Sequence, residues 1–290
     1  MAVTKPIKTR IQFLKREFDT LRKGKEALLT LIDEAEAPES VYNSNAIENS
    51  TLTLRETEKI LLDIAVSRDV SVREMFEAKN LARVVSYIHT KSQEGEIDRK
   101  KILLLHQMLI GGIRDEIAGR FRGRGEYVRV GTYIAPAPEH VEHMIASILS
   151  EYGSDNDSYF LDKIAKFHLE FENIHPFCDG NGRIGRVLIC YQLLRLGFPL
   201  IIIRDKEKAM YYKGFADYRD KKNTKTTEKV LSLALTESLY KRLAYLKGEK
   251  IITLSEYAKQ HGKKAPALFN AARRQNIPAF REKGVWKISE

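Results

Sequence analysis

The chain has 290 residues, 43% of them hydrophobic and 30% charged, so it can bury a substantial core and is expected to be globular. No apolar run reaches membrane-spanning length and basic residues interrupt residues 1–18, so we expect a cytoplasmic protein with no signal peptide and no membrane partner. The two cysteines, Cys178 and Cys190, do not indicate a disulfide framework. The net charge of +10 is uneven, because residues 241–290 hold twelve Lys or Arg and four Asp or Glu, a net +8. This asymmetry marks the C-terminal segment as a separate unit.

The N-terminal third of the sequence is predicted to be helical. Apolar residues at helical spacing predict one or two helices within residues 1–35, and Pro38 then opens a short polar helix that extends to about residue 50. Further helical patterns follow, with Asp98 as the N-cap of the last: residues 54–65, 72–89 and 97–109. His89 and His106 lie in these patterns, and we expect them to be packed or partly exposed rather than metal ligands.

The helical period disappears between Gly123 and Pro138. Residues 127–134 are rich in β-branched and aromatic side chains around Gly131, which predicts a β-hairpin. Taken alone, it would be a surface hairpin that closes a helical bundle. A helix resumes at residues 139–149.

Two amphipathic helices flank the most informative stretch of the chain. Apolar residues recur at helical spacing from Phe160 to Ile174, and Pro176 ends that helix at His175. A second helical pattern begins at Ile184, and Gly197 suits a left-handed C-cap. The prediction is therefore a helix, an eight-residue loop and a second helix.

This loop combines groups that suit a polyphosphate. Residues 180–182 precede a helix N-terminus, where backbone amides and the helix dipole favour an anion. Arg183 and Arg186 add positive charge one turn apart. Asp179 offers a hard oxygen ligand for Mg²⁺, and His175 offers a nitrogen suited to general-base work. Each residue alone would be an ordinary turn or surface residue, but their order predicts a base, a metal ligand and an anion site in one loop.

The C-terminal part contains helices and then a small mixed unit. Residues 198–203 form an apolar run that we expect to be extended and buried, residues 228–246 are helical, and residues 247–250 are a linker. A capping box at residues 253–256 opens a helix to His261, and Pro266 falls in the first turn of a second helix that ends near Arg273 and Arg274. Residues 277–288 then predict a strand, a turn at Lys283-Gly284 and a strand that points Trp286 and Ile288 inward.

Helix, turn, helix and hairpin together resemble a small winged-helix module of the excisionase type over residues 251–290. Its positive charge would suit the phosphate backbone of DNA. The other interpretation is a basic accessory domain that packs on the rest of the chain or binds protein.

From His175 to Arg186 the sequence reads HPFCDGNGRIGR, which resembles the Fic (filamentation induced by cAMP) signature HPFx(D/E)GNGRxxR at every fixed position. Cys178 fills the variable position and is expected to be a small packed residue. The resemblance covers about residues 40–240 and implies a mainly α fold, a Fic-type helical bundle with a small β-hairpin flap. The implied domains are an N-terminal helical region at 1–110, a core at 111–246 with the flap at 125–135 and the catalytic loop at 175–186, and the winged-helix-like unit at 251–290.

What the resemblance implies is transfer of AMP from ATP to a Ser, Thr or Tyr hydroxyl of a target protein, or of the chain itself, with Mg²⁺ as cofactor. His175 would accept the proton of that hydroxyl, Asp179 would hold Mg²⁺, and Phe177 would pack inward and fix the loop. The flap would register the target segment by strand addition. The implied nucleotide-binding residues are Val130, Gly131, Thr132, Tyr133, Asp179, Gly180, Asn181, Gly182, Arg183, Arg186, Tyr211 and Tyr212. For the two rings of Tyr211 and Tyr212, core packing is the alternative interpretation.

A second, shorter resemblance implies regulation. Ser44-Asn45-Ala46-Ile47-Glu48-Asn49 resembles the family's inhibitory motif (S/T)xxxE(G/N), with Ser44, Glu48 and Asn49 at its fixed positions on a helix at about residues 38–50. A Glu48 carboxylate paired with Arg186 would take the place of the γ-phosphate. The same carboxylate would alternatively orient water for the removal of AMP.

Two other function classes remain open. One is a DNA-binding regulator whose core senses nucleotide with little turnover, which the C-terminal unit favours and an intact His175 disfavours. The other is a kinase-like phosphotransfer. That variant accompanies loss of the second glycine of the loop, and Gly182 is present here.

Overall fold

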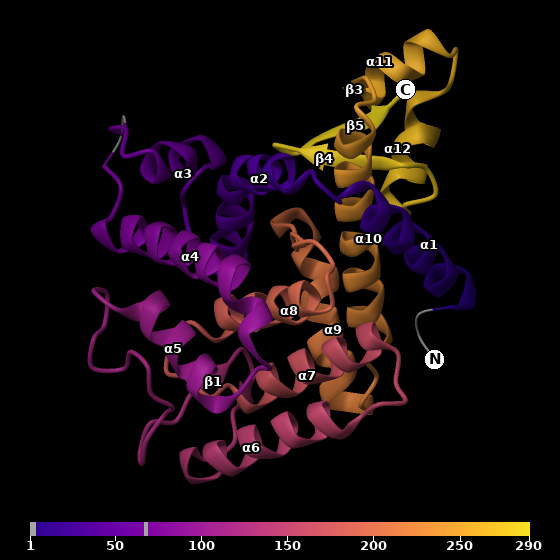
Figure 1. Ribbon diagram of the computed structural model, residues 1–290. Helices are drawn as coiled ribbons and strands as arrows, with labels where there is room; N and C mark the ends of the chain where they lie inside the picture. The colour runs from indigo at the N-terminus through magenta and orange to yellow at the C-terminus, as the bar shows by residue number, and fades with distance from the viewer. Residues whose placement is uncertain (1–3, 67–68) are drawn as a thin grey trace.

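The computed structural model describes residues 4–66 and 69–290, and the chain is mainly helical (Figure 1). The helices before the hairpin are α1 Lys5–Leu21, α2 Glu26–Ile47, α3 Leu54–Leu61, α4 Val72–Lys91, the 3₁₀ helix η1 Ser92–Glu94 and α5 Arg99–Ile110. Those after it are α6 Pro138–Ser154, α7 Phe160–Ile174, α8 Asn181–Arg195, η2 Asp205–Glu207, α9 Lys208–Lys221 and α10 Lys225–Lys247. This confirms the mainly α fold. Within the described residues, no helix combines the length and the apolar character needed to cross a membrane.

Helices α7 and α8 lie at the centre of the fold. One apolar cluster joins them to α4, α5 and α6, with Phe171 and Ile184 fully buried. A second cluster joins them to α1 and α10, with Leu161 and Leu193 fully buried. Because α8 is buried nearly all round, its position is fixed from several sides, and so is the loop that precedes it.

The loop between α7 and α8 is shorter than predicted. Helix α7 ends as expected at His175, which has a left-handed φ of +51° before Pro176. Helix α8 begins at Asn181, three residues before the predicted Ile184, because Gly180 at φ +81° turns the chain directly into the helix. The N–H groups predicted to bind an anion therefore belong to residues of the loop and of the first turn of α8.

Helix α2 corrects the prediction of a break at Pro38. It runs without interruption from Glu26 to Ile47, so the segment with the inhibitory motif is the second half of a long helix. A proline removes only one helix hydrogen bond. Buried ion pairs of Glu36 with Arg242 and of Glu39 with Arg204 hold the helix on both sides of Pro38.

The predicted hairpin is present and short. Strands β1 Arg129–Val130 and β2 Tyr133–Ile134 pair antiparallel around Gly131, whose φ is +60°. The hydroxyl of Tyr133 donates to the carbonyl of Asn173, 3.0 Å away, which ties the hairpin to the end of α7. The hairpin therefore lies beside the catalytic loop.

The C-terminal unit contains the elements predicted for it, and one more. It consists of β3 Ile251–Thr253, α11 Leu254–Gln260, α12 Ala265–Arg273, β4 Ala279–Glu282 and β5 Val285–Ser289. Its antiparallel sheet has the order β3-β5-β4, and the predicted capping box of Thr253 and Glu256 is formed. Strand β3 was missed because its three residues directly precede the helix start. The unit lies at one end of α10 (Figure 1).

Candidate active site

One cavity of about 360 Å³ is lined by eight of the predicted site residues. Its walls come from the end of α2, the hairpin, α7, α8 and α9. The predicted residues that line it are Glu48, Val130, Gly131, His175, Gly182, Arg186, Tyr211 and Tyr212. Residues distant in sequence thus line one cavity.

His175 is held as a neutral base. Its Nδ1 lies 3.4 Å from the carbonyl oxygen of Glu172, an acceptor only, so Nδ1 carries the proton and Nε2 has a free lone pair. Burial lowers the pKa of His175 to about 4. At neutral pH the ring can therefore accept a proton from a substrate hydroxyl.

A rigid frame fixes the loop around His175. The ring of Phe177 is fully buried and stacks on His106, with ring centroids 3.7 Å apart. The side-chain amide of Asn181 accepts from the N–H of Phe177 and donates to its carbonyl, both at 2.8 Å. Arg122 donates to the carbonyls of Ile174 and His175. The side chain of Asn181 thus braces the loop, and its phosphate contact stays a prediction.

His106, expected to be a packed or partly exposed helix residue, connects two loops of the site. In the structure its Nε2 lies 3.0 Å from the carbonyl of Asp179, and its Nδ1 accepts from the N–H of Gly119. Burial lowers the pKa of His106 to about 4, so this bridge is neutral. Nothing in the local sequence distinguishes it from any helical histidine.

Asp179 lies within a ring of alternating charges. Its carboxylate oxygens are 2.7 Å from Arg73 and 3.2 Å from Arg183, and Glu77 contacts the same two arginines. Burial alone would raise the pKa of Asp179, but Arg183 and Arg73 hold it below its usual value. Arg183, which the resemblance assigned to phosphate, is engaged here by the two carboxylates.

The donor set around Asp179 fits Mg²⁺ only in part. Within the described residues there is no cluster of three or more His, Cys, Asp or Glu side chains that could hold a metal by itself. Mg²⁺ prefers octahedral oxygen coordination and commonly binds one carboxylate together with phosphates and water. A single ionised carboxylate beside a helix N-terminus, a position that favours phosphate, suits that mode.

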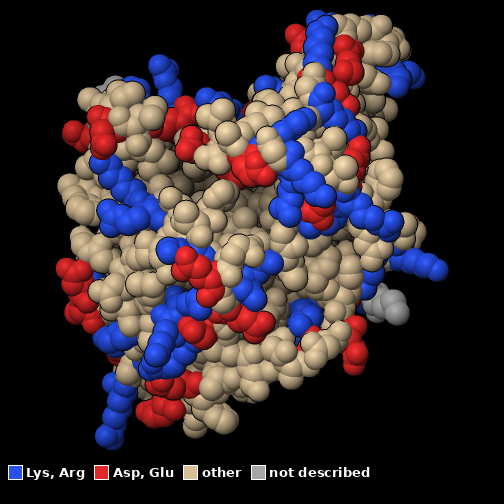
Figure 2. Space-filling model, in the orientation of Figure 1, with Lys and Arg blue, Asp and Glu red and all other residues tan. Residues whose placement is uncertain are grey.

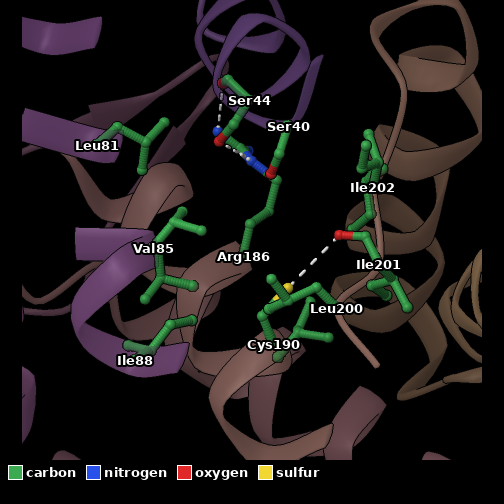
Figure 3. Close-up of a pocket in the computed structure, with 13 residues that line it drawn as sticks. Ser40, Ser44, Leu81, Val85, Ile88, Arg186, Cys190, Leu200, Ile201 and Ile202 are labelled. Atoms are coloured by element: carbon green, nitrogen blue, oxygen red, sulfur yellow. Dashed lines mark hydrogen bonds between the residues drawn. The ribbon is translucent and has the colours of Figure 1, made fainter. Parts of the chain in front are cut away.

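Arg186 faces the inhibitory motif. Its Nη2 is 2.9 Å from Oε1 of Glu48, and its Nε and Nη2 donate to the hydroxyl and carbonyl of Ser44 at 3.0 and 2.8 Å (Figure 3). A Cβ atom added to Gly182 would lie only 2.2 Å from Oε1 of Glu48, so the carboxylate rests directly on that glycine. Asn49 adopts φ +68° just after α2, a conformation that asparagine tolerates well. Ser44 and Glu48 therefore both contact Arg186, whereas Asn49 adopts a left-handed conformation after the helix.

Glu172 is a site residue that sequence reasoning missed. Its side chain lines the same cavity, and its Oε1 is buried with no hydrogen-bond partner in the described part of the chain. Burial, followed by the charge of Glu48, raises the pKa of Glu172 to about 8. The side chain is therefore protonated at neutral pH. No sequence signal separates it from the other acids of α7.

The tyrosine pair Tyr211 and Tyr212 forms part of the cavity wall. Tyr211 is buried and its hydroxyl lies 2.9 Å from Nε2 of His168. Tyr212 is 42% exposed and donates its hydroxyl to the carbonyl of Ile47, the residue before Glu48, at 2.8 Å. Tyr212 therefore links α9 to the end of α2.

Known proteins resemble this chain over the region that contains most of the site. The model of the Fic/DOC family matches residues 96–193, which include the hairpin, α7, the catalytic loop and most of α8. The chain carries a Fic/DOC family domain. A Nematostella vectensis protein named Protein adenylyltransferase Fic is 34% identical over 179 residues, which cover 59% of this chain and 41% of that protein. The chain thus spans about two fifths of the length of that relative.

Solved structures extend the likeness beyond the family match. A Fic domain containing signaling protein from Bacteroides thetaiotaomicron superposes with a TM-score of 0.73 at 25% identity, over 83% of this chain and 98% of that one. A Fic family protein from Desulfovibrio desulfuricans reaches a TM-score of 0.65 at 22% identity, over 97% and 96% of the two chains. The second likeness shows the fold alone. Its coverage extends into the C-terminal unit.

Proposed function

We propose that this protein transfers AMP from ATP to a hydroxyl group of a target protein and that Glu48 restrains the reaction. The observation that carries the proposal is that His175, Gly182 at the start of α8, and Arg186 line one cavity together with the Glu48 carboxylate. The name of the Nematostella vectensis relative, Protein adenylyltransferase Fic, supports the same reaction.

In the proposed reaction the target hydroxyl oxygen forms a bond to the α-phosphorus of ATP. The bond from that phosphorus to the oxygen bridging to the β-phosphate breaks, and pyrophosphate leaves with the electron pair. Nε2 of His175 accepts the hydroxyl proton, since Nδ1 is directed at the Glu172 carbonyl. The N–H groups at the start of α8, including that of Gly182, and the Arg186 guanidinium hold the phosphate chain.

The remaining residues position the reactants. The backbone at Val130 and Gly131 lines the cavity and is suited to pair with a target segment. Tyr211 and Tyr212 provide an aromatic wall for the nucleobase of ATP. Asp179 would hold Mg²⁺, whose charge offsets that of the phosphates. Such catalysis consists mostly of positioning and electrostatic stabilisation.

Restraint follows from competition for Arg186. Because Oε1 of Glu48 lies 2.9 Å from Nη2 of Arg186, the guanidinium has fewer N–H donors available for a terminal phosphate. The Glu48 carboxylate also repels the phosphate chain. A phosphate chain displaced by about 1 Å from in-line geometry can cost on the order of a hundredfold in rate. The Glu48→Gly variant is therefore expected to transfer AMP much faster than the wild type.

The test compares three proteins incubated with α-labelled ATP and Mg²⁺: wild type, Glu48→Gly and Glu48→Gly/His175→Ala. Intact mass should show AMP on Glu48→Gly, on itself or on a protein extract, and none on the double variant. Equal transfer by wild type and Glu48→Gly would overturn the restraint. Label from γ-tagged ATP in place of α-tagged ATP would indicate kinase-like transfer and overturn the reaction itself.

A second candidate function rests on exposed basic residues in and next to α11 and α12. Five of these side chains form no ion pair within the described residues: Lys259, Lys263, Lys264, Arg273 and Arg274. Figure 2 shows both basic and acidic side chains over the side of the C-terminal unit in view. We propose that these basic residues contact the phosphate backbone of duplex DNA. Duplex binding that weakens steeply with salt would support this, and no binding at low salt would refute it.

A further inference from the structure

The C-terminal unit contacts the helix that carries the inhibitory motif. The β4–β5 hairpin ends in the turn Lys283–Gly284, whose φ values are +51° and +78°, and Figure 1 shows the tip of this hairpin beside α2. The N–H of Lys283 donates to Oε2 of Glu39 at 3.0 Å, and the N–H of Gly284 donates to Oε1 at 2.9 Å. The turn thus presents two adjacent donors to both oxygens of one carboxylate.

This contact is buried and supported by other charges. Glu39 is 4% exposed and also accepts from Arg204. Arg204 donates in turn to Glu237 of α10, at 3.0 Å, and Glu237 binds the backbone and guanidinium of Arg281 in β4. Breaking one member of a buried ion network leaves an uncompensated charge, so the hairpin, α10 and α2 hold one another in place.

The contact matters because Glu39 begins the half of α2 that leads to Glu48. Pro38 directly precedes it and has no N–H, so α2 lacks one backbone hydrogen bond at this point. The half of the helix that follows, residues 39–47, leads straight to Glu48. The Lys283–Gly284 turn therefore binds Glu39, the first residue of the half of α2 that positions the Glu48 carboxylate.

We propose that the Lys283–Gly284 turn clamps the inhibitory half of α2, so that the C-terminal unit sets how firmly Glu48 engages Arg186. This inference rests on the proposed restraint by Glu48 and adds its regulation. A partner that drew the hairpin away from Glu39 would weaken the restraint without touching the active site.

The first experiment uses Glu39→Gln, which keeps the shape of the side chain and removes the charge that both N–H donors bind. The matched control is Glu58→Gln in α3, because Glu58 pairs with the same turn through Lys283 Nζ at 2.9 Å and its side chain forms no hydrogen bond or ion pair with α2 within the described residues. Hydrogen exchange of the amides of residues 39–47 should accelerate in Glu39→Gln and not in Glu58→Gln. AMP transfer should rise about tenfold in Glu39→Gln, the ratio expected when a charge-assisted hydrogen bond is lost.

A second variant perturbs the clamp from the other side. Gly284→Ala leaves α2 unchanged, and its new Cβ meets nothing within 4 Å, so its effect comes from the left-handed φ of +78°. It should also accelerate exchange in residues 39–47 and raise transfer. Added to Glu48→Gly, neither variant should raise transfer further, because the restraint is already gone.

The outcomes separate this inference from the proposed function. If Glu48→Gly transfers AMP but Glu39→Gln and Gly284→Ala match the wild type in both exchange and transfer, the clamp is refuted and the restraint stands. If Glu48→Gly is no more active than the wild type, the restraint itself fails. Accelerated exchange in Glu39→Gln would then still show a clamp on α2, one without a catalytic role.

Discussion

Glu172→Gln tests the electrostatics of the cavity. In the folded chain, burial and the Glu48 charge raise the pKa of Glu172 from 4.5 to about 8, against a lowering effect of Arg186. Because the folded state binds this proton more tightly than the unfolded state, the stabilisation it gives is complete below pH 4.5 and is lost as the pH rises to 8. At about 1.4 kcal/mol per pKa unit, this shift corresponds to a loss of about 5 kcal/mol in the free energy of unfolding. That is a large part of the roughly 5–15 kcal/mol that stabilises a typical domain.

Urea unfolding between pH 5 and 9 would measure this effect. The wild type should lose stability over that range, whereas Glu172→Gln, which carries no titrating proton, should lose much less and be the more stable protein at pH 9. Glu170→Gln is the control, because Glu170 is on the same helix and accepts from the Tyr218 hydroxyl. Parallel pH profiles for wild type and Glu172→Gln would refute a protonated Glu172. In a Glu48→Gly background the pH effect should shrink, since one cause of the raised pKa is removed.

Further predictions concern the frame of the site. Asn181→Ala should lower the unfolding free energy in urea by about 2–4 kcal/mol, because two buried backbone groups of Phe177 lose their partner. His106→Leu should lower the unfolding free energy by about 2–3 kcal/mol, because the Asp179 carbonyl and the Gly119 N–H lose their hydrogen-bond partner. Tyr212→Phe removes the bond to α2 and should raise AMP transfer about fivefold when Glu48 is intact and not at all in Glu48→Gly. Normal stability in either frame variant, or unchanged transfer in Tyr212→Phe, would contradict these assignments.

The sequence was most informative where structure depends on neighbouring residues. The end of α7 at His175 follows from Pro176, the start of α11 follows from the capping box, and the hairpin turn at Lys283-Gly284 follows from its glycine. The predicted catalytic loop was recognised for the same reason, because its histidine, aspartate and arginines fall within twelve consecutive residues. Local rules and a contiguous motif were sufficient for these features.

Contacts between residues that are distant in sequence could not be predicted from such local rules. The continuity of α2 through Pro38 depends on ion pairs with residues of α10 and the segment before η2, which are far away in sequence. Glu172 and His106 gain their character from burial against α8 and Phe177, and an isolated helix would leave them as ordinary polar residues. The pKa of a carboxyl or imidazole group depends on its surroundings, and those surroundings depend on the whole fold.

The second half of α2 is held at separate points by different elements. The C-terminal turn holds Glu39, Tyr212 of α9 holds Ile47, and Arg186 of α8 holds Ser44 and Glu48. Under the proposed restraint these contacts are not equivalent. Loss of Arg186 would release Glu48 but would also remove a phosphate-binding group, whereas loss of the contact at Glu39 would loosen the helix and leave the cavity intact. Regulation that preserves catalysis must therefore act through α2 itself or through the elements that hold it from outside the cavity, and the C-terminal hairpin is such an element.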